Sequence, residues 1–77
     1  PQQRVYVQHR LREHGREVYA WLEGGAHLYV CGAVAMSKDV HTALVEIAVL
    51  HGGRPREDAA AWLDALLAEG RYARDVY

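Results

Sequence analysis

The stretch HLYVCG at residues 27–32 decides how the rest of the chain is interpreted. It is a short run rich in apolar and β-branched residues, and its length favours a buried strand over a helix. Cys31 and Gly32 close the run, and a helical pattern begins a few residues later at Met36. In open α/β sheets, ligands bind just beyond the carboxyl ends of the strands. Cys31 therefore stands where chemistry is expected.

A first helix is expected before this strand, beginning between Tyr6 and His9 and ending at Gly24-Gly25, because a glycine commonly ends a helix. Its apolar residues recur at spacings that place them on one face of an amphipathic helix. These residues are Val7, Leu11, Val18, Trp21 and Leu22. Gly15 weakens the middle of this helix by ~1 kcal/mol relative to alanine.

Two further helices are expected after the strand. The second, over residues 36–51, is apolar around so much of its circumference that it requires cover on two sides. Gly52-Gly53 ends it. Pro55 suits the first residue of a third helix, whose first turn carries two acidic residues at the positive end of the helix dipole. Gly70 closes that helix.

The expected order is helix, strand, helix, helix and a final extended segment over residues 72–77. A strand–helix–helix–strand unit is long enough to join two parallel strands. The fold class predicted is α/β, as the C-terminal portion of a doubly wound parallel sheet whose other strands lie outside this chain. Residues 1–77 are thus interpreted as a single partial domain. Trp21 and Trp62 each lie on an apolar helix stripe and are expected in the core.

Size and composition exclude several functions. A chain of 77 residues is one small domain or part of one, and its net charge of −1 argues against a nucleic-acid binder that neutralises phosphates. No apolar run approaches the ~20 residues of a membrane span. A single cysteine suits a reducing compartment, so we expect a cytoplasmic protein. Because the sequence begins at Pro1, we expect a piece of a longer protein.

The beginning of the chain carries a possible anion-binding group. Arg4, Tyr6 and Gln8 are spaced by two and project to one side of an extended stretch. They offer a cation for a phosphate, an aromatic ring for a base and an amide for hydrogen bonds. The alternative is a solvated start of the first helix.

Cys31 also has two interpretations. A free cysteine is commonly a small buried hydrophobe. At the end of a strand and near the start of a helix, it can instead be reactive. Gly32 lacks a Cβ and so permits the close approach of a ligand. None of the five histidines has a recognised metal-ligand spacing to Cys31, so no metal site is expected.

Three separated motifs occur in this chain: RVYVQ at residues 4–8, CG at residues 31–32 followed by Met36, Asp39 and Val40, and RYARDVY at residues 71–77. In this order they resemble the C-terminal part of the NADPH-binding domain of the diflavin reductases, a domain of the ferredoxin–NADP reductase type. That family includes the sulfite reductase flavoprotein and NADPH–cytochrome P450 reductase, and the motifs are nearest to the former. The resemblance runs from Arg4 to Tyr77.

The resemblance implies roles for the first two motifs. The segment that would hold the 2′-phosphate of NADPH consists of Arg4, Val5, Tyr6, Val7 and Gln8. Arg4 replaces the lysine of the family and keeps its charge, and a guanidinium suits a phosphate well. Gly32 would let the cofactor approach closely. Asp39 would lie near the adenosine of NADP, or it simply stabilises the N-terminus of its helix.

By the same resemblance, Cys31 would lie beside the nicotinamide and assist hydride transfer to FAD, supported by Asp75. Tyr77 would stack on the flavin ring through its flat face, the alternative being a surface aromatic on an ordinary final strand. This chain departs from the family after Gly32. It reads AVAM where relatives have Asp-Ala, two variable residues and Met, so the aspartate and one loop residue are missing.

The resulting hypothesis is part of an NADPH-dependent flavin oxidoreductase. Hydride would pass from NADPH to FAD, and electrons onward to an acceptor such as a hemoprotein or a cytochrome. An upstream domain of the same parent chain would bind most of the FAD. The parent chain is also compatible with FMN as a second flavin. We expect this segment alone to be inactive. The alternative is a non-catalytic α/β module whose apolar helices bind a partner protein.

Overall fold

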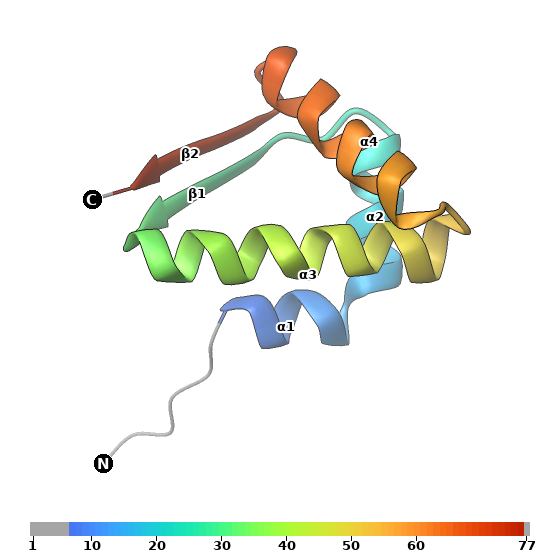
Figure 1. The fold of residues 1–77 in the computed structure, drawn as a ribbon, viewed down its shortest axis with the longest axis horizontal. Helices are drawn as coiled ribbons and strands as arrows, with labels where there is room; N and C mark the ends of the chain where they lie inside the picture. The colour runs from blue at the N-terminus through green and yellow to red at the C-terminus, as the bar shows by residue number, and fades with distance from the viewer. Residues whose placement is uncertain (1–6, 77) are drawn as a thin grey trace.

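The computed structural model describes residues 7–76 of the chain. Four helices and two strands follow one another along these residues (Figure 1). Their bounds are α1 Val7–Glu13, α2 Gly15–Glu23, β1 Leu28–Gly32, α3 Val34–Gly52, α4 Arg56–Ala68 and β2 Tyr72–Val76. No helix within this part of the chain is long and apolar enough to cross a membrane.

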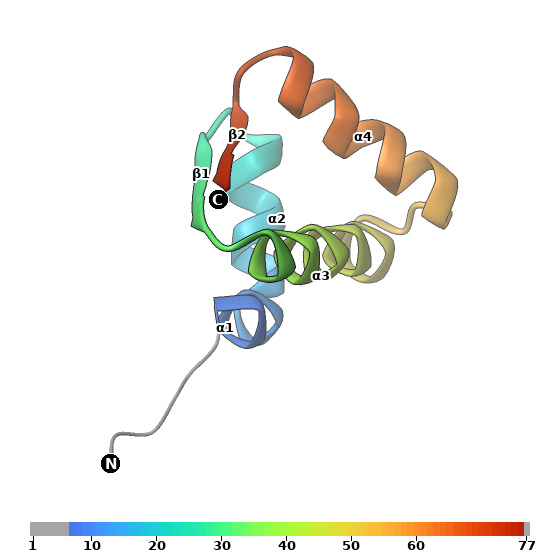
Figure 2. The ribbon, with the colours of Figure 1, turned by 60° about the vertical axis from the view of Figure 1, so that its left-hand side comes forward.

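The two strands form a parallel pair, as the predicted strand–helix–helix–strand unit requires. Their register runs from Leu28 opposite Tyr72 to Gly32 opposite Val76. Helices α3 and α4 make the connection that brings β2 back beside β1 (Figures 1 and 2). The architecture is therefore α/β with a parallel two-stranded sheet, which is compatible with part of a doubly wound domain.

Helix α3 is the centre of the core. It lies between α1 on one side and the sheet and α4 on the other (Figure 2). Val40 and Leu44 are fully buried, as expected for a helix that is apolar around most of its circumference. The core that α3 organises consists of Val18, Leu22, Val30, Val40, Leu44, Val45, Ile47, Ala48, Ala59, Leu63, Leu66 and Tyr72.

The prediction of one continuous first helix is wrong. The chain bends at His14, so α1 and α2 are separate helices that point in different directions (Figure 1). Gly15, the first residue of α2, is buried against α3 directly after the bend. A Cβ at this position would lie 3.0 Å from Nε2 of His51 and 3.1 Å from Cγ1 of Ile47. The missing side chain at Gly15 therefore lets the start of α2 lie close against α3 at the bend.

The burial predicted for Trp21 is also wrong, since its side chain is 63% exposed. Val18 and Leu22 face the core from α2, and Trp21 lies about a quarter turn away from that line. The prediction for Trp62 is partly confirmed. Its ring is half-buried against the core and lies 5.1 Å from the ring of Tyr19, while its indole N–H donates to Glu23 Oε1 at 2.9 Å.

The other element ends are close to those expected. Strand β1 begins one residue later than predicted, and α3 begins at Val34 instead of Met36. Pro55 precedes α4 as its N-cap and not as its first residue. Gly70 closes α4 as predicted, with a φ of 78° that favours glycine. The amides of Gly70 and Arg71 donate to the carbonyls of Leu67 and Leu66, which is the hydrogen-bond pattern of a Schellman motif.

Candidate functional site

The carboxyl ends of β1 and β2 bring the two predicted catalytic residues together. Cys31 and Asp75 are register partners on the neighbouring parallel strands. Successive side chains of a strand alternate between faces, so register partners in a parallel pair project to the same face. Both residues are exposed. Residues distant in the sequence thus present a thiol and a carboxylate side by side on an open surface.

Tyr29 lies on the same face as Cys31, two residues before it on β1. Its hydroxyl donates a hydrogen bond to Oδ2 of Asp75 at 3.2 Å. Partial loss of solvent raises the pKa of the Tyr29 phenol, and the hydrogen bond to Asp75 and the charges of Asp75 and Cys31 raise it further. Tyr29, Cys31 and Asp75 together form what we call the outer-face cluster. Sequence reasoning did not include Tyr29 in the site, because only the pairing of the strands brings it to Asp75.

Gly32 ends β1 beneath a side chain of α3. A Cβ at Gly32 would lie 2.3 Å from Cε of Met36, so the methyl group of Met36 fills the space that glycine leaves. The short connection explains this contact, because α3 begins at Val34 with only Ala33 between it and the strand. The expectation that Gly32 admits a cofactor stays a prediction.

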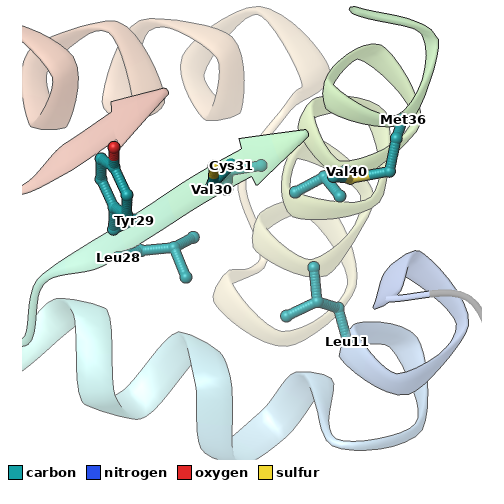
Figure 3. A pocket seen from close by; sticks show the side chains of 7 residues that line it. All are labelled: Leu11, Leu28, Tyr29, Val30, Cys31, Met36 and Val40. Carbon is teal, nitrogen blue, oxygen red and sulfur yellow. The ribbon is translucent and has the colours of Figure 1, made fainter. Parts of the chain in front are cut away.

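An apolar groove runs along the edge of β1 that does not pair with β2, between that strand, α3 and α1 (Figure 3). Its volume is about 290 Å³. The residues that line it are Leu11, Leu28, Tyr29, Val30, Cys31, Met36 and Val40. Cys31 therefore belongs both to the outer-face cluster and to the wall of an apolar groove.

A second polar cluster supports β2 from the opposite, inner face. Tyr72 is 1% exposed, and its hydroxyl lies 3.4 Å from Nδ1 of His41 on α3. The two rings are stacked, with centroids 6.1 Å apart and planes at 19°. The guanidinium of Arg74 lies 5.8 Å from the centroid of the Tyr72 ring. No sequence signal identified this cluster, because its members come from distant elements.

The surroundings of His41 and Tyr72 favour their neutral forms. Burial lowers the pKa of His41, and the charge of Arg74 lowers it further, while Asp64 has the opposite influence. Burial raises the pKa of Tyr72, and Arg74 opposes that shift. The inner face thus favours an uncharged histidine–tyrosine pair, whereas the outer face carries the acidic side chain of Asp75.

The remaining predicted site residues are scattered or not described. Asp39 is an exposed residue of α3 beyond the first turn, where the influence of the helix dipole has largely faded. Val7 and Gln8 begin α1 and are not in an extended stretch. The residues that lie outside the described part are Arg4, Val5, Tyr6 and Tyr77. Between residues 7 and 76 no group of three potential metal ligands occurs.

Comparison with known proteins gives a consistent result. No model of a protein family matches the chain. The chain is 49% identical over 77 residues to the sulfite reductase (NADPH) flavoprotein alpha-component of Aliivibrio fischeri. The aligned region covers 99% of this chain and 13% of the relative. The protein of the same name from Pectobacterium atrosepticum is 53% identical over 75 residues, covering 96% of the chain and 12% of the relative.

The relative from Serratia proteamaculans, also a sulfite reductase (NADPH) flavoprotein alpha-component, is 52% identical over 77 residues and covers 99% of the chain. The chain spans about 13% of the length of that relative. The resemblance to the sulfite reductase type inferred from the motifs is therefore confirmed. Over almost its whole length, this chain is homologous to a segment of the sulfite reductase (NADPH) flavoprotein alpha-component.

Proposed function

We propose that this chain is the C-terminal part of an NADPH-binding domain in a flavoprotein reductase that passes hydride from NADPH to FAD. Electrons then continue to an acceptor protein, for which we propose a hemoprotein. The observation that carries this proposal is the register pairing of Cys31 with Asp75 at the carboxyl ends of parallel strands. Both the NADPH and the flavoprotein character appear in the relatives' names.

The outer-face cluster fits the nicotinamide end of such a cofactor. When bound, NADPH supplies a hydride, and FAD accepts it. The carboxylate of Asp75 would stabilise positive charge that develops on a bound donor ring, because a fixed negative group beside a growing cation lowers the energy of the transition state. The soft, polarisable thiol of Cys31 would pack against the ring and hold it in place.

The other residues of the motifs bind the rest of the cofactors in this proposal. Arg4, with the segment through Gln8, holds the 2′-phosphate. Asp39 would lie near the adenosine, and Gly32 would permit close approach at the end of β1. By the family resemblance, Tyr77 would cover the flavin ring. These roles rest on the motifs shared with the family. They are not argued from contacts within residues 7–76.

An upstream domain of a longer parent chain completes the site in this proposal. The length of the relatives supports it, since the matched segment is 12–13% of each. That upstream part would bind most of the FAD and, in a two-flavin parent, FMN. The segment by itself is then expected to be colourless and inactive with NADPH.

A second candidate function is a non-catalytic module that binds a partner protein. The apolar groove beside the unpaired edge of β1 favours it, because such a surface can accept an extended segment of another protein. NADPH-driven flavin reduction by the full-length chain would favour the reductase over this alternative.

The test of the proposal is Cys31→Ser in the full-length chain. We expect flavin reduction in rapid mixing to slow by about 10-fold while the Kd for NADPH changes little, which marks an interaction made mainly in the transition state. Flavin content and reduction by dithionite serve as controls for folding. Unchanged flavin reduction by NADPH would remove Cys31 from the site.

Coenzyme choice gives a separate test of the first motif. Arg4→Ala should raise the KM for NADPH by about 10-fold, because one charge-assisted contact contributes about 1.5–3 kcal/mol. The KM for NADH should barely change, since NADH lacks the 2′-phosphate. Equal losses for both coenzymes would assign Arg4 a structural role only.

A further inference from the structure

The outer-face cluster contains a contact that the proposed roles of Cys31 and Asp75 do not use. The Tyr29 hydroxyl donates to Oδ2 of Asp75 at 3.2 Å across the two strands. In the register of the sheet, Tyr29 stands opposite Ala73, so its side chain crosses diagonally to reach Asp75. Figure 3 shows the hydroxyl pointing from β1 toward β2.

The register explains why this diagonal contact forms. Ala73 carries only a methyl group opposite Tyr29, which leaves room for the phenol ring to lean toward Asp75. Diagonal neighbours in a sheet lie within reach of long aromatic side chains. The contact therefore follows from a large residue facing a small one beside the carboxylate.

Within residues 7–76, Asp75 has few other partners that could fix its orientation. The side chain of its neighbour Arg74 belongs to the other face, where the guanidinium lies over the Tyr72 ring. No salt bridge to Asp75 is present among residues 7–76. In that part of the chain, the hydroxyl of Tyr29 is the side-chain donor that holds the carboxylate.

We propose that Tyr29 is a positioning residue, whose hydroxyl orients the Asp75 carboxylate beside the Cys31 thiol. This inference rests on the proposed function, in which Asp75 supports hydride transfer. Tyr29 need not touch the cofactor in this role. It acts by restricting the carboxylate to the orientation in which it meets the developing charge, because catalytic groups are effective only when held in the productive geometry.

The first test does not depend on activity. In the full-length chain with 13C-labelled tyrosine, the phenol signal of Tyr29 is assigned with Tyr29→Phe and titrated by NMR. The hydrogen bond to Asp75 and its charge both raise the pKa of this phenol, so Asp75→Ala should move the titration to lower pH. A titration that stays in place would show that the two side chains do not interact, and would overturn the inference.

The second test asks whether Tyr29 acts through Asp75. Tyr29→Phe removes one hydroxyl and keeps the ring, and we expect it to slow flavin reduction by about 3- to 10-fold with an unchanged Kd for NADPH. In an Asp75→Ala background the same substitution should have no further effect. Equal slowing by Tyr29→Phe in both backgrounds would overturn the positioning role.

Tyr72→Phe provides the matched control. It removes a phenol hydroxyl from the same sheet but from the face where His41 is its partner. Its effect should be the same with and without Asp75, because the two groups share no contact. Coupling of Tyr72→Phe to Asp75→Ala as strong as that of Tyr29→Phe would count against a specific role for Tyr29.

The outcomes also separate this inference from the proposed function. A wild-type full-length chain that binds flavin but is not reduced by NADPH would overturn the proposed function and the positioning role in hydride transfer with it. A chain that is reduced by NADPH, with Tyr29→Phe as fast as wild type, would overturn the positioning role alone.

Discussion

Tyr29 and Tyr72 stand one on each face of the two-stranded sheet, and their surroundings differ. Tyr72 is 1% exposed and packs among α3, α4 and Arg74, whereas Tyr29 is 64% exposed and contacts Asp75. The inner face therefore fixes the position of the strands by burial. The outer face, held in place by that packing, exposes a thiol, a phenol and a carboxylate to solvent.

The largest expected effect comes from truncating each tyrosine in turn. Tyr72→Ala should lower the free energy of unfolding by about 3–5 kcal/mol, as for other large aromatic residues removed from a core. Tyr29→Ala should lower it by no more than about 0.5–1 kcal/mol, because most of its ring remains in water. Urea unfolding followed by circular dichroism measures both. Equal losses would show that the two faces contribute alike to stability.

A pair of neighbours on β2 sharpens the functional side of the comparison. Asp75→Ala should slow NADPH-driven flavin reduction by about 10- to 100-fold, because it removes a fixed charge beside the reacting ring. Arg74→Ala removes a cation from the inner face, where it lies over Tyr72. We expect it to lower stability by about 0.5–1 kcal/mol and to leave flavin reduction within about 2-fold.

The rate of flavin reduction is measured by rapid mixing, and the free energy of unfolding by urea titration, for both variants. If Arg74→Ala slows flavin reduction as much as Asp75→Ala does, the two faces of the sheet do not differ in function.

The smallest expected effect concerns pH. Burial and then Arg74 lower the pKa of His41 below its ordinary value of 6.5, so the folded chain binds fewer protons at this residue than the unfolded chain does. Stability should therefore fall as the pH drops below about 6.5 toward the lowered pKa. His41→Gln should reduce this acid sensitivity. The measurement is the urea midpoint at about pH 7.5 and about pH 5.5, and an equal loss in both proteins would contradict the prediction.

Much of the fold was predictable because its signals are local. The strand at residues 28–32, the apolar helix α3 and the glycine-closed helix α4 each follow from periodicity, length and end residues within one segment. Parallel pairing also followed, since two helices between two strands are long enough for a crossover. The break at His14 did not, because α2 packs through Gly15 against α3, and no pattern within the first helix contains that neighbour.

The candidate site divides in the same way. The sequence by itself pointed to Cys31 and Asp75 as candidate site residues, because the motifs around them resemble those of a known family. Comparison with curated proteins confirms that resemblance. The roles of Arg4 and Tyr77 stay predictions, because both residues lie outside the described part of the chain.

Only the tertiary structure decided that Cys31 stands opposite Asp75, that Tyr29 reaches the Asp75 carboxylate and that His41 meets Tyr72. Each of these contacts joins residues from elements far apart in the chain. Local propensity acts over a few residues, whereas strand register and helix packing are set by the burial of the whole core, so the partners of a side chain appear only when that core has formed.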